Sequence, residues 1–89
     1  MLGTNVWAGG YELDIVLRRG GRLVFCEVKA KGGSGYGDPL EMITPEKVRR
    51  LARAGESWLA AHPETAGLEV SYEAIGLAAG RFQRVPLII

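Results

Sequence analysis

Residues 12–29 have the sequence Glu-Leu-Asp-Ile-Val-Leu-Arg-Arg-Gly-Gly-Arg-Leu-Val-Phe-Cys-Glu-Val-Lys, in which two apolar runs flank a pair of glycines. Adjacent glycines between two such runs predict a β-hairpin with a tight turn. If Gly20 and Gly21 are the two loop residues, Arg19 faces Arg22, and this pair sets the register of the whole hairpin. The hairpin is therefore the segment from which the rest of the fold is predicted.

The same register places four charged residues on one side of the hairpin. Asp14 lies opposite Glu27, and Glu12 lies opposite Lys29. Because side chains alternate between the two faces of a strand, all four project from one face. Carboxylates directly opposite each other are about 5 Å apart at Cβ and repel. We therefore expect a compensating cation, either a divalent metal ion or the ammonium group of Lys29.

The composition bounds the class of protein. A chain of 89 residues, 47% of them hydrophobic, predicts one small folded domain over residues 1–89. The net charge of +1 does not by itself indicate a nucleic-acid binder, so any basic surface depends on local clustering. The single cysteine, Cys26, excludes an internal disulfide, and we expect it to be a small buried residue. No apolar run approaches the length of a membrane span, and residues 1–3 do not resemble a secretion signal, so we expect a cytoplasmic protein without membrane contact.

The hairpin strands, residues 11–18 and 22–30, carry apolar side chains on both faces. This pattern predicts a sheet that is at least partly buried on both sides. Residues 1–10 contain three glycines and predict an irregular or weakly extended lead-in, with Trp7 covering an end of the sheet. We expect the core face to carry Leu13, Ile15, Leu17, Val24, Cys26 and Val28.

A helix is predicted over residues 45–61. Thr44 suits the N-cap, Pro45 the first helical position and Glu46 the positive end of the helix dipole. The helix should end near His62, because a residue before proline disfavours the helical conformation. We interpret His62 as a favourable group at the negative helix end rather than as a ligand or base. The apolar stripe of this helix consists of Val48, Leu51, Ala52, Gly55, Trp58 and Leu59.

Two further strands, over residues 68–75 and 81–89, complete a predicted sheet of four strands. Pro86 favours an edge position for the last strand, because proline cannot donate a ladder hydrogen bond. Between the hairpin and the helix, residues 31–38 form a glycine-rich loop. Such a loop either approaches a ligand closely or simply connects two elements.

The charged cluster suits metal-assisted hydrolysis of a phosphodiester. Asp14 and Glu27 offer carboxylates to Mg²⁺ or Mn²⁺, and the carbonyl of Val28 is a candidate third ligand; magnesium prefers one or two carboxylates together with waters and substrate phosphate. The ion would polarise the phosphate and activate water, while Lys29 would orient that water or stabilise developing charge. Glu12 would contact the ligand residues without touching the metal itself, or would form a salt bridge with Lys29. The alternative is an exposed strand face on which Glu12 pairs with Lys29 and the other two carboxylates are solvated.

Basic residues near the cluster are candidates for nucleic-acid contacts. Arg49, Arg50 and Arg53 lie together on the helix face away from the apolar stripe, and Lys47 flanks that stripe in the first turn. Lys31 follows the charged cluster directly and is better placed to contact a phosphate. A basic surface of this kind gives salt-dependent binding without sequence preference. The alternative is a solvated helix face with no ligand.

These stretches together resemble the bacterial YraN-like family of the PD-(D/E)xK nuclease superfamily, in its Holliday-junction-resolvase-like branch. The family usually begins with an N-terminal helix that bears an acidic residue, and this chain starts after it. It also usually has aspartate where Glu73 stands, and Thr-Arg is commoner at Ala30-Lys31. The resemblance covers nearly the whole chain and lies in Gly10-Tyr-Glu-Leu-Asp-Ile15, Leu23-Val-Phe-Cys-Glu-Val-Lys29, Tyr36-Gly-Asp-Pro39, Ile43-Thr-Pro-Glu-Lys47 and Ser71-Tyr-Glu-Ala-Ile75.

The resemblance implies an α/β fold, a restriction-endonuclease-like mixed β-sheet with a packed helix and no N-terminal helix. It implies Asp14 and Glu27 as metal ligands, Lys29 as the catalytic lysine, and Mg²⁺-dependent endonuclease cleavage of branched or structured DNA. Two alternatives keep the fold without the reaction: a non-catalytic nucleic-acid-binding module and a protein-interaction domain. One helix covers only one sheet face, so we also expect a homodimer formed through the uncovered face, the edge strand near residues 85–89 or the segment around Trp7.

Overall fold

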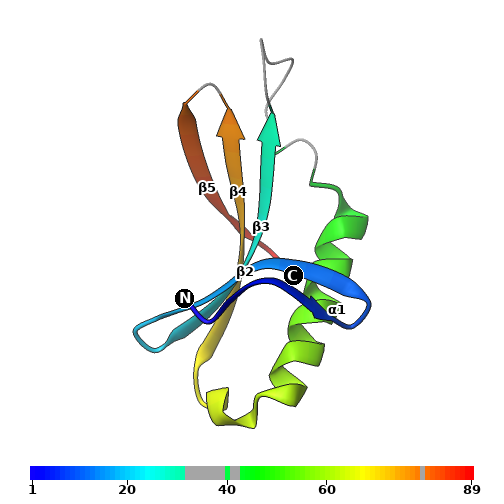
Figure 1. The fold of residues 1–89 in the computed structure, drawn as a ribbon, viewed down its shortest axis with the longest axis vertical. Helices are drawn as coiled ribbons and strands as arrows, with labels where there is room; N and C mark the ends of the chain where they lie inside the picture. Colours follow the sequence, from blue (N-terminus) through cyan, green and yellow to red (C-terminus); the bar gives the residue numbers. More distant parts are fainter. Residues whose placement is uncertain (32–39, 41–42, 79) are drawn as a thin grey trace.

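The structure is a computed structural model that describes residues 1–31, 40, 43–78 and 80–89. Within these residues the protein forms a five-stranded sheet with one long helix against it (Figure 1). The strand order is β1-β2-β3-β4-β5; β3 and β4 are parallel, and the other neighbours are antiparallel. The elements are β1 (Gly3–Ala8), β2 (Tyr11–Arg19), β3 (Arg22–Lys31), α1 (Pro45–Ala61), the 3₁₀ turn η2 (Pro63–Thr65), β4 (Glu69–Ala78) and β5 (Arg81–Leu87). This mixed sheet with a packed helix confirms the predicted α/β class and is consistent with a restriction-endonuclease-like fold.

The β2–β3 hairpin has the predicted turn and register. Its paired residues run from Arg19 opposite Arg22 to Ile15 opposite Cys26. Gly20 has a φ of 62°, a left-handed conformation that glycine adopts at no steric cost, which explains the glycine in the turn. The turn chemistry alone therefore fixed which side chains of the two strands share a face.

Beyond Ile15 and Cys26 the two hairpin strands part. The earlier residues of β2 pair with β1, whereas the later residues of β3 pair with β4. Leu13 and Val16 both belong to the core under the helix, although side chains three apart would point to opposite faces of a regular strand. The alternation of β2 is therefore broken between them, and Figure 1 shows β1 and β2 curving across the line of β3 and β4. The parting of the strands creates a fork at Asp14 and Glu27.

The prediction of an irregular or weakly extended lead-in over residues 1–10 understates their order, because residues 3–8 form the edge strand β1. Five residues of β1 are paired along β2, and this pairing makes the segment a strand although it has no regular alternation of apolar residues. The sheet therefore has five strands in the described residues instead of the predicted four. Trp7 does not bury its ring against an end of the sheet, since its side chain is 71% exposed.

Helix α1 has the predicted bounds and caps. The Thr44 hydroxyl accepts a hydrogen bond from the Lys47 backbone N–H at 3.2 Å, and Pro45 is the first helical residue. His62 is the C-cap; its Nδ1–H donates to the Trp58 carbonyl at 2.7 Å, and its ring stacks on Trp58. These contacts confirm the interpretation of His62 as part of a helix end.

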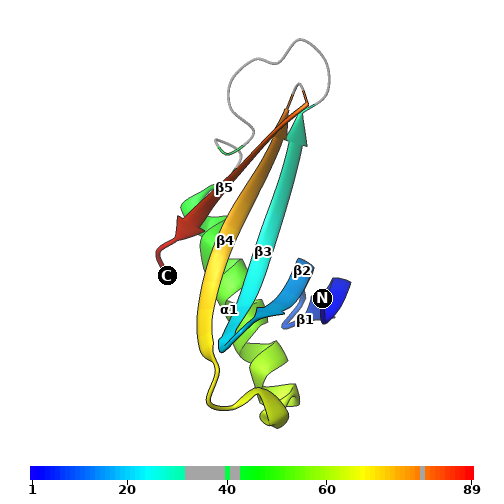
Figure 2. The ribbon, with the colours of Figure 1, turned by 90° about the vertical axis from the view of Figure 1, so that its left-hand side faces the viewer.

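The core lies on the sheet face that α1 covers, here called the helix face, with α1 behind β3 and β4 in Figure 2. This corrects the predicted core face. Val16, Leu23 and Phe25 face the helix. The β3 residues predicted for the core face, Val24, Cys26 and Val28, alternate with them and lie on the other side of the sheet. Both faces of the hairpin are apolar, and only the position of α1 decides between them. The buried core consists of Leu13, Val16, Leu23, Phe25, Leu51, Ala54 and Trp58.

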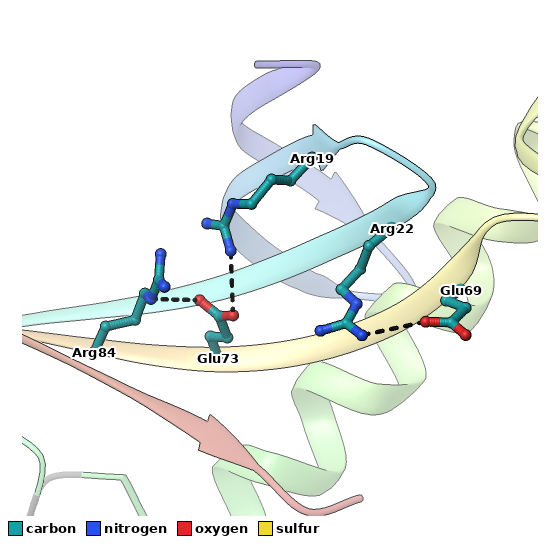
Figure 3. Close-up of polar contacts among 5 residues, drawn as sticks. All are labelled: Arg19, Arg22, Glu69, Glu73 and Arg84. Atoms are coloured by element: carbon teal, nitrogen blue, oxygen red, sulfur yellow. Dashed lines mark hydrogen bonds and ion pairs between the residues drawn. The ribbon is translucent and has the colours of Figure 1, made fainter.

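The opposite sheet face is covered by long charged side chains. Val24 and Cys26 are buried on it, as predicted for the cysteine. Burial, followed by the nearby Glu73, raises the pKa of the Cys26 thiol to about 11. Glu73 lies 3.8 Å from Arg19 and 3.4 Å from Arg84, and a second pair joins Arg22 to Glu69 at 3.2 Å (Figure 3). The aliphatic parts of such side chains shield apolar surface while their charged ends remain paired.

The last two strands close the sheet. β4 extends three residues beyond the predicted end at residue 75, and β5 is the edge strand that Pro86 predicted. Of the predicted glycine-rich loop over residues 31–38, Lys31 is the last residue of β3, and the rest lies outside the described residues. No helix in the described part of the chain is long and apolar enough to cross a membrane.

Candidate metal centre at the strand fork

The fork between β2 and β3 brings the three predicted catalytic side chains to one pocket. Asp14 comes from β2 at the point where it leaves β3, and Glu27 and Lys29 come from β3 beyond that point. We call the space between them the acidic pocket. It has a volume of about 370 Å³ and is lined by Trp7, Gly10, Tyr11, Glu12, Asp14, Glu27, Val28 and Lys29.

Glu27 is a buried carboxylate with one oxygen unsatisfied. Only 4% of the residue is exposed. Its Oε1 accepts a hydrogen bond from the Tyr11 hydroxyl at 3.1 Å and lies 3.4 Å from Lys29 Nζ. Its Oε2 is buried and has no hydrogen-bond partner. Burial, followed by the negative charge of Asp14, raises the pKa of the Glu27 carboxyl above its ordinary value. An additional positive charge at Oε2 would remove this unfavourable arrangement.

Asp14, on β2, forms a hydrogen bond to β3 at the point where the two strands separate. Its Oδ2 accepts a hydrogen bond from the Val28 backbone N–H at 2.8 Å, across the position where the strand ladder has ended. The expected pairing of Glu12 with Lys29 is not formed in the described residues. Glu12 pairs with Trp7 on β1, and the Lys29 ammonium lies against Glu27 instead. The divergence of the strands explains the difference, because it carries Glu12 away from β3.

The residues of the acidic pocket fit a hard divalent cation. Two carboxylates converge there, and one buried oxygen lacks a partner. No group of three or more histidine, cysteine, aspartate or glutamate side chains that could hold a metal occurs among the described residues. Magnesium needs only one or two carboxylates beside its waters and a substrate phosphate, so a pair is sufficient. Val28, the candidate third ligand, lines the same pocket.

Tyr11 is a residue of the acidic pocket that the sequence analysis missed. Its hydroxyl donates to Glu27, and burial together with that carboxylate raises the pKa of Tyr11 to about 12. Tyrosine at the start of a strand has no distinctive spacing. One signal was available, since Tyr11 alternates with Leu13 and so faces the helix side of the sheet.

The predicted basic residues are brought together only in part. Arg50 and Arg53 line a small hollow of about 150 Å³ together with Gly9, Gly10 and Tyr11. Gly10 and Tyr11 also line the acidic pocket, so the two hollows are neighbours. Arg50 also pairs with Glu46 at 2.7 Å, one helical turn away. Lys47 lines neither hollow in the described residues, and the side chain of Lys31 lies outside them.

Arg49 lies elsewhere, beside a larger apolar hollow between α1 and β5. We call this hollow, of about 630 Å³, the apolar groove. It shares no residue with the acidic pocket. The apolar groove is lined by Ile43, Pro45, Val48, Ala52, Ala74, Val85, Leu87, Ile88 and Ile89, with Arg49, Arg53 and Glu56 as its charged residues.

Comparison with known proteins gives the family. The model of the uncharacterised protein family UPF0102 matches residues 1–86. The UPF0102 protein of Acidothermus cellulolyticus is 43% identical over 77 residues, which are 86% of this chain and 58% of the relative. The UPF0102 protein of Methylocella silvestris is 41% identical over 73 residues, 82% of this chain and 57% of the relative. The chain thus spans a little over half the length of these relatives. These matches confirm the resemblance drawn from the sequence: the chain belongs to the uncharacterised protein family UPF0102, the YraN-like family, which is PD-(D/E)xK nuclease-like.

Proposed function

We propose that this protein is a metal-dependent endonuclease that hydrolyses phosphodiester bonds in branched or structured DNA. The observation that carries the proposal is the unpartnered Oε2 of Glu27, buried beside Asp14 and Lys29. A purely structural carboxylate at such a place would be expected to have both oxygens satisfied. The likeness of the family to PD-(D/E)xK nucleases supports the same chemistry.

The residues of the acidic pocket have distinct roles in this proposal. Asp14 and Glu27 would hold Mg²⁺ or Mn²⁺, with the Val28 carbonyl as a further oxygen ligand, and the bound ion would polarise the phosphate and acidify water. Lys29, at 3.4 Å from Glu27 Oε1, is held to orient the attacking water or to stabilise charge on the phosphate. The Tyr11 hydroxyl fixes the orientation of the Glu27 carboxylate.

The nucleic-acid path in this proposal runs past Tyr11. Arg50 and Arg53 adjoin the acidic pocket there and are the described basic residues best placed to contact phosphates. Lys31 and Lys47 remain candidates for further contacts. Neutralisation of phosphates by such residues gives binding that weakens steeply with salt. The choice of branched or structured DNA rests on the likeness to the Holliday-junction-resolvase-like branch.

The test is cleavage of a panel of linear, flapped and four-way DNA with Mg²⁺ or Mn²⁺. We expect Lys29→Ala to lower the cleavage rate by about 10²- to 10³-fold, as for removal of one charge-stabilising donor. Arg81→Ala is the matched control, because it removes the same charge at an exposed position outside the acidic pocket.

Metal binding is measured in parallel by calorimetry with Mn²⁺. We expect Asp14→Asn to abolish binding while the protein remains folded. If the wild-type protein binds no ion at millimolar metal and cleaves none of the DNAs, the nuclease proposal fails. DNA binding without metal binding would instead favour the non-catalytic nucleic-acid-binding module, and binding of neither would favour the protein-interaction domain.

We further propose a homodimer formed through the C-terminal part of β5 and the apolar groove. Ile88 is 95% exposed and Ile89 is 59% exposed, beside an edge strand and a large apolar hollow. The opposite sheet face is a poorer candidate, because paired charges cross it. A two-fold contact would cover the same groove on both copies. A cytoplasmic setting also belongs to the proposal, since it keeps Cys26 reduced.

A further inference from the structure

Trp7 is exposed on a strand whose neighbouring residues are packed. Val6 and Ala8 lie against the core, so alternation along β1 directs the intervening side chain away from it. The residue is 71% exposed. Trp58, the other tryptophan of the chain, is only 6% exposed, and its ring contacts Phe25 and His62. Tryptophan is highly buried on average, so an exposed ring with no core role calls for another explanation.

The location of Trp7 supplies that explanation. It lines the acidic pocket together with Asp14, Glu27 and Lys29. The pocket shares two of its lining residues, Gly10 and Tyr11, with the hollow lined by Arg50 and Arg53. Trp7, the two carboxylates and the two arginines therefore line two hollows that share Gly10 and Tyr11. These are the groups that bind the base, the metal-bound phosphate and the flanking phosphates of a single strand.

We propose that Trp7 stacks on an unpaired base next to the cleaved phosphate, and so selects single-stranded or splayed segments over intact duplex. This inference rests on the proposed function and gives its substrate a chemical description. Stacking on an aromatic ring requires a free base face, which a duplex presents only at its ends, at flaps and at junctions. Every base has such a face, so the selection is for unpaired structure and not for sequence.

The test compares three proteins that all carry Lys29→Ala, so that cleavage in Mg²⁺ is slow during the measurement: one with Trp7, one with Trp7→Phe and one with Trp7→Ala. Fluorescence anisotropy measures the binding of one labelled oligonucleotide as a single strand, in a flap and in a closed-end duplex. We expect Trp7→Ala to weaken single-strand and flap binding by about 5- to 150-fold, as for the loss of one stacked base. Duplex binding should stay within about two-fold, and Trp7→Phe should retain most of the affinity.

Phe82→Ala is the matched control. Phe82 is 66% exposed but does not line the acidic pocket, so its removal should leave all three affinities unchanged. Quenching of tryptophan emission by the single strand should disappear in the Trp7→Phe protein. Equal weakening of all three DNAs, or no weakening, would overturn the role of Trp7 while leaving the nuclease proposal intact. Selective binding without cleavage in the wild-type protein would overturn the nuclease proposal alone, and binding to none of the DNAs would overturn both.

Discussion

Glu27 carries a carboxyl group into a pocket that already contains another carboxylate. Burial is the largest cause of its raised pKa, and Asp14 is the next. The hydrogen bond from Tyr11 and the charge of Lys29 act in the opposite direction without cancelling the shift. The ionised form of Glu27 is therefore disfavoured by the fold, and a cation bound at the site would relieve this penalty.

The sign of the pH dependence follows from the direction of that shift. A group whose pKa is higher in the folded state contributes stability below its unfolded pKa, near 4.5 for this carboxyl, and this contribution is lost as the pH rises through the folded pKa. We compare the free energies of unfolding of Glu27→Gln and wild-type protein in the presence of a chelator. We expect the difference to shift in favour of Glu27→Gln as the pH rises from about 4 to about 7. Urea unfolding at both pH values is the measurement.

The control for this prediction is Glu69→Gln, which changes an exposed carboxyl group on the opposite sheet face. It should show no comparable gain. Addition of Mg²⁺ at the higher pH should stabilise the wild-type protein and leave the Glu27→Gln protein unchanged. If the stability difference between the wild-type and Glu27→Gln proteins does not vary with pH, the pKa of Glu27 is not raised by the fold and the prediction fails.

At the scale of the elements, α1 packs tightly against the sheet at Gly55. A Cβ atom at this position would lie 2.5 Å from the Tyr72 hydroxyl and 2.8 Å from its Cε1. The Tyr72 ring is stacked on Phe25 and cannot move without disturbing the core. The glycine is therefore required by packing, even though it lies inside a helix.

We expect Gly55→Ala to destabilise the protein by about 1–3 kcal/mol, the usual range for overpacking. The clash must outweigh a gain of about 1 kcal/mol in helix propensity, so the sign itself is informative. Ala60→Gly, at an exposed position of the same helix, measures the propensity effect alone. Denaturant unfolding of both variants is the measurement, and a stabilised Gly55→Ala protein would show that the helix can move away from β4.

At the scale of the whole molecule, the apolar groove and the exposed Ile88 and Ile89 form an apolar surface among the described residues. We expect light scattering over a concentration series to give a mass approaching twice the 9.6 kDa of one chain. Ile88→Asp should return the monomer, because it places a charge at the centre of the proposed contact.

Trp7→Asp is the control for the dimer, since it changes an exposed apolar residue outside the apolar groove. It should leave the mass unchanged. Dissociation by Trp7→Asp but not by Ile88→Asp would move the contact to the segment around β1. A monomer mass at high concentration, with the wild-type chain folded, would refute the dimer.

Local chemistry in the sequence determined the hairpin, the helix and the edge strand. Adjacent glycines set the turn and register of β2 and β3, and the Thr44 and Pro45 signals set the start of α1. Pro86 indicated an edge position for β5, because proline has no backbone N–H to donate to a neighbouring strand. Each of these features depends on contacts within a few residues, so the sequence carries them explicitly.

Tertiary structure decided the features that depend on distant partners. The two faces of the hairpin are both apolar, and the packing of Trp58 and Leu51 of α1 selected the one that became the core. Pairing along β2 made residues 3–8 a strand, although residues 1–10 contain three glycines and little periodic pattern. The break in β2 then opened the fork that brings Tyr11 to Glu27 and leaves Trp7 beside them. A regular strand alternates without interruption, so no periodicity in the sequence could reveal the position where the two strands separate.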